Sequence, residues 1–277
     1  MTPSGRTKLV AVIGSPVGHS LSPVIHNAGF AALGLDWVYV ALEVAEGRAG
    51  DALTGMRALG VQGLSVTMPH KTAVAAAVDE LSPDAARLRA VNCVVRLDDR
   101  LVGHNTDGQG LIDSLRREVG FEPAGSRCGV VGAGGAARAV VAALARQGAA
   151  HIVVVNRSPE RAAAAATLGD GRAVVGSFND LSSCDLVVNA TPVGMGQRGD
   201  DSAMPFAPEL LSAPQIYAEL IYQPLETPFL AAVRRRGVLA VNGVGMLVHQ
   251  AAVQFELWTG CVAPVSAMLA AVTDRLE

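Results

Sequence analysis

Short apolar runs of strand length alternate with Ala-rich and Leu-rich runs of helix length along the whole chain. Strands that are separated by helices pair in parallel, and the helices then cover both faces of the sheet. The alternation therefore predicts an α/β protein. A chain of 277 residues lies near the length at which one hydrophobic core splits into two, so we expect two domains.

The two kinds of run give the expected elements. In the first part of the chain we expect strands at residues 9–13, 37–42, 64–67, 91–96 and 101–104, and helices at 23–33, 49–59, 83–88 and from Lys71 onward. Ser22 directly precedes Pro23 and is expected to cap the first helix. In the second part we expect helices at 108–118, 134–147, 159–168, 246–259 and 264–275, and six parallel strands at 128–131, 152–156, 173–175, 186–189, 216–220 and 238–241.

Charge and residue spacing exclude several classes of function. Lys and Arg number 22 against 25 Asp and Glu, and no basic cluster exceeds the triplet 234–236, so we expect no nucleic acid partner. The long uncharged runs 9–35 and 237–255 are interrupted by polar residues, so we expect no membrane span. The four cysteines are far apart in apolar surroundings, which is typical of reduced core thiols in a cytoplasmic protein. No His or Cys spacing suits a metal, and none is expected.

A glycine-rich turn joins the strand at 128–131 to the following helix. Residues 132–137 (GAGGAA) fit the pattern G-x-G-x-x-[G/A] in the strand-turn-helix context that dinucleotide binding requires. Gly132 permits the tight turn, Gly134 lets the backbone approach a pyrophosphate, and Ala137 keeps helix and strand close. The helix start supplies N–H groups and partial positive charge to the phosphates. We therefore expect a Rossmann-type domain.

The end of the next strand indicates which dinucleotide is bound. No carboxylate follows the strand at 152–156, whereas Arg157 does, with Arg161 one helical turn further on. An acidic residue there would bind the ribose 2′-hydroxyl of NAD, but an arginine can pair with a 2′-phosphate. This favours NADP(H), the alternative being that both arginines are only solvated.

Polar turns also follow the strands expected in the first part of the chain. Ser20 and Ser22 lie two residues apart before a helix, so both hydroxyls could face one anion. The alternative is that Ser22 only caps the helix. Lys71 follows the turn after the strand at 64–67, where a lone lysine is usually solvated, and Asn92 and Asp107 lie at further strand ends.

Eight segments together resemble the shikimate dehydrogenases of the shikimate/quinate dehydrogenase family, in their order and at about their spacing. They are GSPVGHSLSP, SVTMPHK, AVNCVV, HNTDG, GAGGAARA, NRSPER, NATPVGM and NGVGMLVHQAAVQFELWTG. The resemblance implies NADPH-dependent reduction of 3-dehydroshikimate to shikimate, on the way to chorismate and the aromatic amino acids. It also implies an N-terminal α/β substrate-binding domain, residues 1–107 plus about 246–277, and an NADP-binding Rossmann domain, residues 108–245, with the C-terminal helices returning to the first domain. The family includes monomers and homodimers.

The resemblance also assigns roles to individual residues. Lys71 and Asp107 match the family's catalytic pair, with Lys71 as the acid in the reduction. The substrate carboxylate is expected at Ser20 and Ser22, with help from Tyr222, and the ring hydroxyls at Thr67, Asn92 and Gln250. The positions that match cofactor contacts are Gly132, Ala133, Gly134, Gly135, Ala136, Asn156, Arg157, Arg161, Thr191, Met195 and Gly243.

One position departs from the family pattern. Ser65 stands where the family commonly carries Asn before the Val-Thr pair, and serine lacks an amide's two donors and carbonyl. We expect Ser65 to hydrogen-bond a ring hydroxyl directly or through water. A relaxed pocket could admit quinate or an aminated shikimate. A methylene-tetrahydrofolate dehydrogenase-like enzyme and a non-catalytic NADPH-binding regulatory module are further alternatives.

Overall fold

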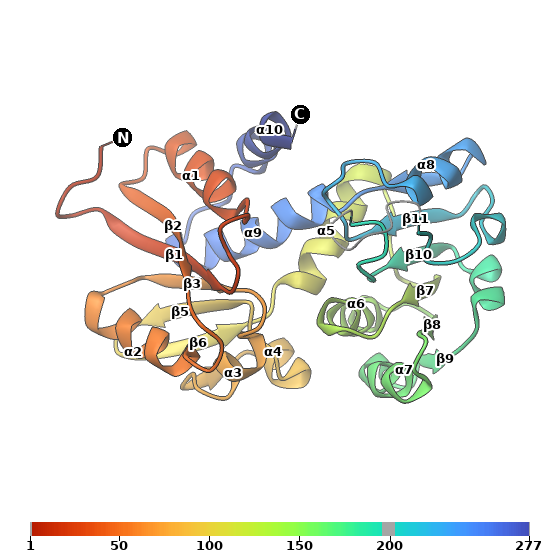
Figure 1. Cartoon of the computed structure of the whole chain (residues 1–277), viewed down its shortest axis with the longest axis horizontal. Coiled ribbons are helices and arrows are strands. Elements are labelled where there is room, and N and C mark those ends of the chain that lie inside the picture. Colours follow the sequence, from red (N-terminus) through yellow and green to blue (C-terminus); the bar gives the residue numbers. More distant parts are fainter. Residues whose placement is uncertain (1, 196–202, 277) are drawn as a thin grey trace. The chain divides into compact units, whose positions relative to one another are not determined.

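The computed structural model describes residues 2–195 and 203–276 and divides into two compact units (Figure 1). The first unit combines Met1–Thr106 with Val248–Glu277, and the second is the continuous segment Asp107–Leu247. The chain therefore passes from one unit to the other at Thr106 and returns at Leu247.

The first unit contains a mixed six-stranded sheet in the order β2-β1-β3-β5-β6-β4. Its strands are β1 (Lys8–Gly14), β2 (Trp37–Glu43), β3 (Gly63–Val66), β4 (Glu80–Leu81), β5 (Cys93–Leu97) and β6 (Arg100–His104). β1 pairs in parallel with β2 and β3, whereas β5 is antiparallel to β3 and to β6. Only Asp98 and Asp99 separate β5 from β6, and a two-residue connection allows no parallel pairing. The uniform alternation in the sequence did not predict this antiparallel pair.

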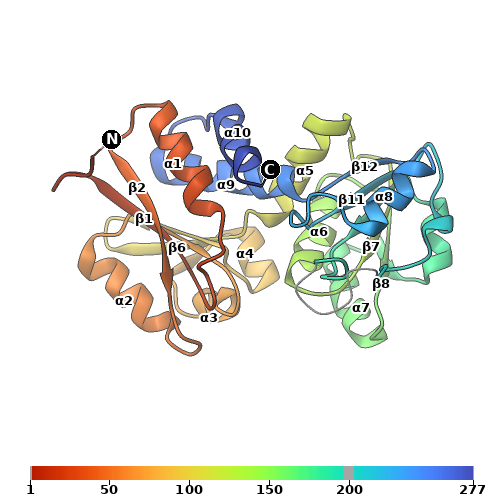
Figure 2. The same cartoon turned by 45° about the horizontal axis from the view of Figure 1, so that its top comes forward.

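Helices from both ends of the chain cover this sheet. They are α1 (Ser22–Ala32), α2 (Ala49–Leu59), α3 (Lys71–Ala75), α4 (Pro83–Leu88), α9 (Val244–Thr259) and α10 (Val265–Leu276). α10 packs against α1, as Figure 2 shows. Small residues permit close packing of α9 within this unit: a Cβ on Gly29 of α1 would lie 3.0 Å from the Phe255 ring, and one on Gly63 of β3 would overlap the Trp258 indole. The Trp258 Nε1–H donates to the carbonyl of Val94 at 3.0 Å.

The second unit contains a parallel six-stranded sheet in the order β12-β11-β10-β7-β8-β9, which confirms the predicted sheet. Its strands are β7 (Arg127–Val131), β8 (His151–Val155), β9 (Ala173–Val175), β10 (Leu186–Asn189), β11 (Ile216–Glu219) and β12 (Leu239–Val241). The helices are α5 (Asp107–Val119), α6 (Gly135–Arg146), α7 (Pro159–Ala166) and α8 (Pro228–Arg235), with short 3₁₀ segments η1 (Thr167–Gly169), η2 (Phe178–Ser183) and η3 (Pro208–Leu210).

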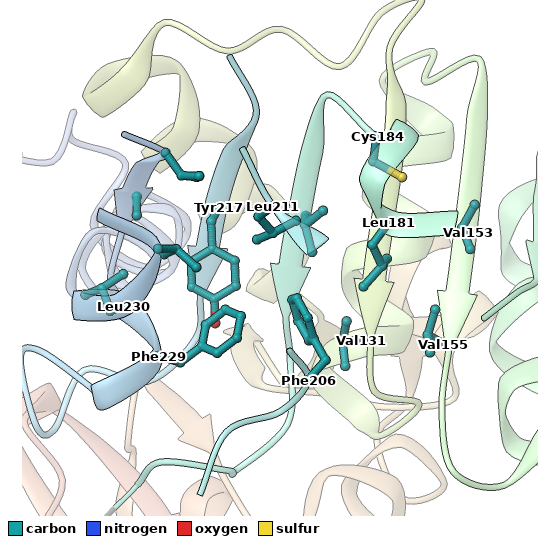
Figure 3. Close-up of a cluster of buried hydrophobic side chains, with 14 residues drawn as sticks. Val131, Val153, Val155, Leu181, Cys184, Phe206, Leu211, Tyr217, Phe229 and Leu230 are labelled. Atoms are coloured by element: carbon teal, nitrogen blue, oxygen red, sulfur yellow. The ribbon is translucent and has the colours of Figure 1, made fainter. Parts of the chain in front are cut away.

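A buried cluster fills one side of the second sheet (Figure 3). Tyr217 of β11 packs on Phe229 of α8 with ring centroids 5.0 Å apart, and Phe206 meets Phe229 edge-on at 4.6 Å. Val131 of β7 and Val153 and Val155 of β8 belong to the same cluster. The sequence prediction omitted α8, although Thr227 caps it by accepting a hydrogen bond from the N–H of Leu230 at 3.0 Å.

The free cysteines are partly as predicted. Cys93, Cys128 and Cys184 are buried, and burial raises the pKa of each thiol, to about 12 for Cys128. Cys261 is only half-buried, so the prediction of a core position was wrong for this residue. In the described ranges no three His, Cys, Asp or Glu side chains are grouped to hold a metal ion, and no helix there is long and apolar enough to span a membrane.

Candidate active site

One edge of the first unit's sheet gathers most of the residues predicted to bind substrate. β1 and β3 are parallel neighbours, so their carboxyl ends, Gly14 and Val66, lie at the same edge. β5 runs the opposite way, and its first residue, Cys93, pairs with Ser65 on one side and with His104 on the other. The polar turns recognised in the sequence therefore follow one another along a single edge.

The loop after β1 carries the two candidate serines to the start of α1. The backbone N–H of Ser22 donates to Ser20 Oγ at 3.3 Å, and the Ser22 side chain is buried. The prediction that Ser22 caps α1 was wrong: the N-cap position is Leu21, and no side chain caps the helix. An uncapped helix start beside two hydroxyls suits an anionic group.

Lys71 begins α3 in a turn that is fixed on both sides. Its own carbonyl accepts a hydrogen bond from the N–H of Val91 at 2.9 Å. The preceding residue, His70, is buried and donates from Nε2 to the carbonyl of Val44 at 2.7 Å. Thr67 opens the same turn, and its carbonyl accepts from the N–H of His70 at 3.0 Å. These bonds fix the backbone from which the half-buried Lys71 side chain projects.

Asn92 and Thr106 hold together the strand ends that lead to Asp107. Asn92 Oδ1 accepts from the N–H of Thr106 at 2.8 Å, and Asn92 Nδ2 donates to Thr106 Oγ1 at 3.0 Å. The Thr106 hydroxyl donates to the carbonyl of Gln250 on α9 at 3.1 Å. Asp107 comes next in the chain, is buried and begins α5. The backbone at Asp107 is thus fixed by the same bonds that hold Asn92.

Two residues that the sequence did not indicate complete this group. Tyr39 donates from its hydroxyl to Ser65 Oγ at 2.6 Å, and the Ser65 hydroxyl donates to Gln254 Oε1. Gln254 in turn donates from Nε2 to Gln250 Oε1 at 2.7 Å. Ser65, Tyr39 and Gln254 are all buried. Polar residues on a strand and on a helix distant in sequence gave no local signal, because each alone resembles an ordinary solvated position.

The glycine turn in the second unit has the geometry that phosphate binding requires. Gly132 has φ 115°, where only glycine is comfortable, and a Cβ there would lie 3.0 Å from the Ala190 carbonyl oxygen. A Cβ on Gly134 or Gly135 would meet nothing within 4 Å, and both residues are exposed. α6 starts here without a side-chain cap. An open, glycine-lined helix start fits a pyrophosphate.

The other candidate cofactor residues lie at the carboxyl ends of neighbouring parallel strands, and so at the same edge as the glycine turn. Arg157 and Arg161 are exposed after β8, and Met195 is exposed after β10. Thr191 donates from Oγ1 to Asn189 Oδ1 at 2.7 Å. The N–H of Gly243 donates to the carbonyl of Ile221 at 2.7 Å. Asn156 Nδ2 donates to the carbonyl of Ser158 at 3.1 Å, and Ser158 caps α7.

The end of β11 carries Tyr222 and a buried carboxyl group. Tyr222 is half-buried and belongs to the second unit, unlike the serines with which it was expected to act. Glu219 is buried, and this burial raises its pKa to about 7. Its Oε2 accepts from Thr227 Oγ1 at 2.9 Å and from the Tyr217 hydroxyl at 3.2 Å. Within the described residues its Oε1 has no hydrogen-bond partner, and neither does Nδ2 of the adjacent Asn189.

The two units together define a class of protein. The second sheet reverses its strand order between β7 and β10, where a glycine turn and basic side chains form a dinucleotide site. The first unit presents serines, amides and a lysine at one sheet edge, which suits a small, oxygen-rich anion. A chain that carries a dinucleotide site in one unit and such a substrate site in the other is typical of a nicotinamide-dependent oxidoreductase.

Comparison with known proteins identifies the family. Three family models match: the shikimate dehydrogenase substrate binding domain over residues 12–94, shikimate/quinate 5-dehydrogenase over 115–193, and the shikimate 5′-dehydrogenase C-terminal domain over 243–273. The shikimate dehydrogenase (NADP(+)) of Moorella thermoacetica is 46% identical over 95% of this chain and 91% of its own length. The chain therefore belongs to the shikimate dehydrogenase family.

Solved structures agree with this membership. A shikimate dehydrogenase in complex with NADP+ superposes with a TM-score of 0.94 at 35% identity, covering 100% of this chain and 98% of the other. The Thermus thermophilus enzyme in complex with NADP(H) and shikimate has a TM-score of 0.88 at 37% identity, covering 96% and 99%. The predicted family and fold class are thus confirmed.

Proposed function

We propose that the chain reduces 3-dehydroshikimate reversibly to shikimate with NADPH, using Lys71 and Asp107 as its catalytic pair. The chain is an NADP-dependent oxidoreductase of the shikimate pathway. The observation that carries the residue assignment is the single sheet edge that joins the Ser20 and Ser22 loop, the Lys71 turn and the Asn92 strand end. Membership of this family argues against the methylene-tetrahydrofolate dehydrogenase alternative.

Reduction of a ketone requires a hydride at carbon and a proton at oxygen. Bound NADPH supplies the hydride. The Lys71 ammonium stabilises the negative charge that develops on the oxygen and donates the proton. Asp107 orients Lys71 and accepts a hydrogen bond from a substrate hydroxyl. Ser20 and Ser22 donate to the substrate carboxylate, with Tyr222 as a third donor.

The remaining amides and hydroxyls hold the ring, and the second unit holds the cofactor. Thr67, Asn92 and Gln250 bind ring hydroxyls, with Ser65 as a further contact. The open glycine turn at 132–136 fits the pyrophosphate, and Arg157 with Arg161 would pair with the 2′-phosphate. Asn156, Thr191, Met195 and Gly243 line the same sheet edge for the rest of the dinucleotide.

The catalytic assignment is tested with the Lys71→Ala variant. We expect kcat to fall by about 10²- to 10⁴-fold, as for loss of a general acid, with the affinity for NADP+ unchanged. Lys8→Ala is the matched control, because Lys8 is the other lysine of the sequence and lies over the Trp37 ring, 5.1 Å from its centroid. A near-native kcat in Lys71→Ala would refute the assignment.

The substrate is tested by following nicotinamide absorbance with wild-type enzyme, NADP+ and each of shikimate, quinate and an aminated shikimate. We expect the largest kcat/KM with shikimate. Equal values would contradict the choice of shikimate and indicate the relaxed pocket considered above. Cofactor binding without turnover of any of the three would indicate a regulatory module.

A further inference from the structure

Gln254 is the most connected polar side chain at the proposed substrate edge, and no role has been assigned to it. Its side chain is buried on α9, one helical turn after Gln250. Nε2 lies 2.7 Å from Gln250 Oε1, 3.2 Å from Thr106 Oγ1 and 3.4 Å from the carbonyl oxygen of Asn92, and Oε1 accepts from the Ser65 hydroxyl. Three of these four partners are proposed substrate residues.

The chemistry of the partners fixes which way round the Gln254 amide lies. The carbonyl of Asn92 can only accept, so the nitrogen of Gln254 must face it and the oxygen must face Ser65. Burial raises the pKa of Tyr39, so its phenol keeps the proton and donates to Ser65 Oγ at 2.6 Å. The Ser65 proton is then available for Gln254 Oε1.

The orientation of the Gln254 amide also determines the orientation of the Gln250 amide. Because Gln254 Nε2 donates to Gln250 Oε1, the oxygen of the Gln250 amide is turned toward Gln254 and its nitrogen away from it. The hydrogen bonds therefore run in one direction, from Tyr39 through Ser65 and Gln254 to Gln250. Ser65 within this series and Gln250 at its end are both proposed substrate contacts.

We propose that Gln254 is a positioning residue that sets the orientation of the Gln250 amide and of the Ser65 hydroxyl for recognition of the substrate's ring hydroxyls. This proposal rests on the function proposed above. The proposal also accounts for the presence of Ser65 where the family pattern has Asn. The side-chain amide of Gln254 on α9 accepts a hydrogen bond from the Ser65 hydroxyl, so an amide still lies beside β3 at this sheet edge. The specificity of the ring site then depends on the Ser65–Gln254 pair and not on one residue.

The Gln254→Glu variant tests the direction of these hydrogen bonds at nearly constant shape. A carboxylate would place an acceptor against the Asn92 carbonyl and against Gln250 Oε1, so the Gln250 amide must turn over to donate to it. We expect KM for shikimate to rise roughly 10- to 100-fold, the range expected when buried partners are left unsatisfied. The affinity for NADP+ should stay unchanged, because the proposed cofactor residues belong to the other unit.

Gln254→Met provides a second variant that fills the space without polar atoms, and we expect it to raise KM for shikimate in the same way. Adding Ser65→Asn to Gln254→Ala restores an amide from the strand side, and KM should return toward the wild-type value. Glu256→Gln is the matched control: Glu256 is exposed on the same helix and accepts from the N–H of Ala263 at 3.0 Å, which glutamine can still do. It should leave the kinetics unchanged.

A lowered melting temperature with an unchanged KM for shikimate in both Gln254→Glu and Gln254→Met would overturn the proposal and leave Gln254 a purely structural residue. Wild-type turnover of shikimate reports on the proposed function, whereas the variant-to-wild-type ratio of KM reports on Gln254, so the two failures are distinguishable.

Discussion

The buried carboxyl group of Glu219 makes folding stability depend on pH in a direction that can be worked out. Burial raises its pKa from 4.5 to about 7, against the opposing hydrogen bonds from Thr227 and Tyr217. In the unfolded chain the group loses its proton near pH 4.5, whereas the folded chain keeps it until about pH 7. The folded state therefore binds more protons in this interval, and its stability falls as the pH rises.

Each pKa unit of difference between the folded and unfolded chain corresponds to about 1.36 kcal/mol, so the free energy of unfolding falls by about 3 kcal/mol. This loss of stability is complete above pH 7. Glu219→Gln removes the titrating group and keeps an oxygen for Thr227 and Tyr217. Its new NH₂ replaces an oxygen that has no partner among the described residues. We expect equal stability of variant and wild type at pH 4.5, and a variant that is more stable by about 3 kcal/mol at pH 8.

Urea unfolding of both proteins at pH 4.5 and at pH 8, followed by circular dichroism, measures this difference. Glu226→Gln is the matched control, because Glu226 is an exposed partner of Arg234 at 2.8 Å in the same unit, and loss of such a pair changes stability by at most about 1 kcal/mol. A stability difference between Glu219→Gln and wild type that does not grow with pH would refute the reasoning.

Further predictions concern packing and the cofactor. Gly63→Ala places a Cβ on the Trp258 indole and should destabilise the fold by about 1–3 kcal/mol. Gly55→Ala, in open space on α2, should instead stabilise it by up to about 1 kcal/mol. Urea unfolding measures both changes in stability, and equal effects of the two variants would contradict the packing argument. Arg157→Ala should raise KM for NADP+ and leave KM for NAD+ unchanged, and Arg157→Ala/Arg161→Ala should do so more strongly. Steady-state kinetics with both cofactors checks this, and an unaltered preference would show that the 2′-phosphate is bound elsewhere.

Most elements were predictable because their signals are local. The runs at 49–59 and 83–88 coincide with α2 and α4, and the six strands of the second sheet follow the apolar runs. The two-residue β4 is too short to produce a pattern. α8 was not predicted, although Thr227 and Pro228 give the usual signal for a helix start.

The candidate site was predictable only where its residues lie in contiguous motifs. Lys71, Asn92 and the glycine turn stand in such segments. Tyr39 and Gln254 do not, since they acquire their roles through hydrogen bonds to Ser65, which is 26 and 189 residues away from them in the chain. The predicted Ser22 cap was wrong because Ser22 is already the first residue of α1, whose N-cap position is Leu21.

The discontinuity of the first unit has a consequence for how the chain folds during synthesis. Residues 107–247 form the second unit from one uninterrupted segment, so it can fold as soon as that segment leaves the ribosome. Part of the first unit is synthesised earlier, but this unit must wait for α10 and for α9, which supplies Phe255 and Trp258 to its core. Until then, the apolar surface of α1 and β3 that α9 will cover remains exposed to solvent. The unit whose synthesis begins first is therefore the last to be completed, and we expect chaperones to act mainly on this first unit.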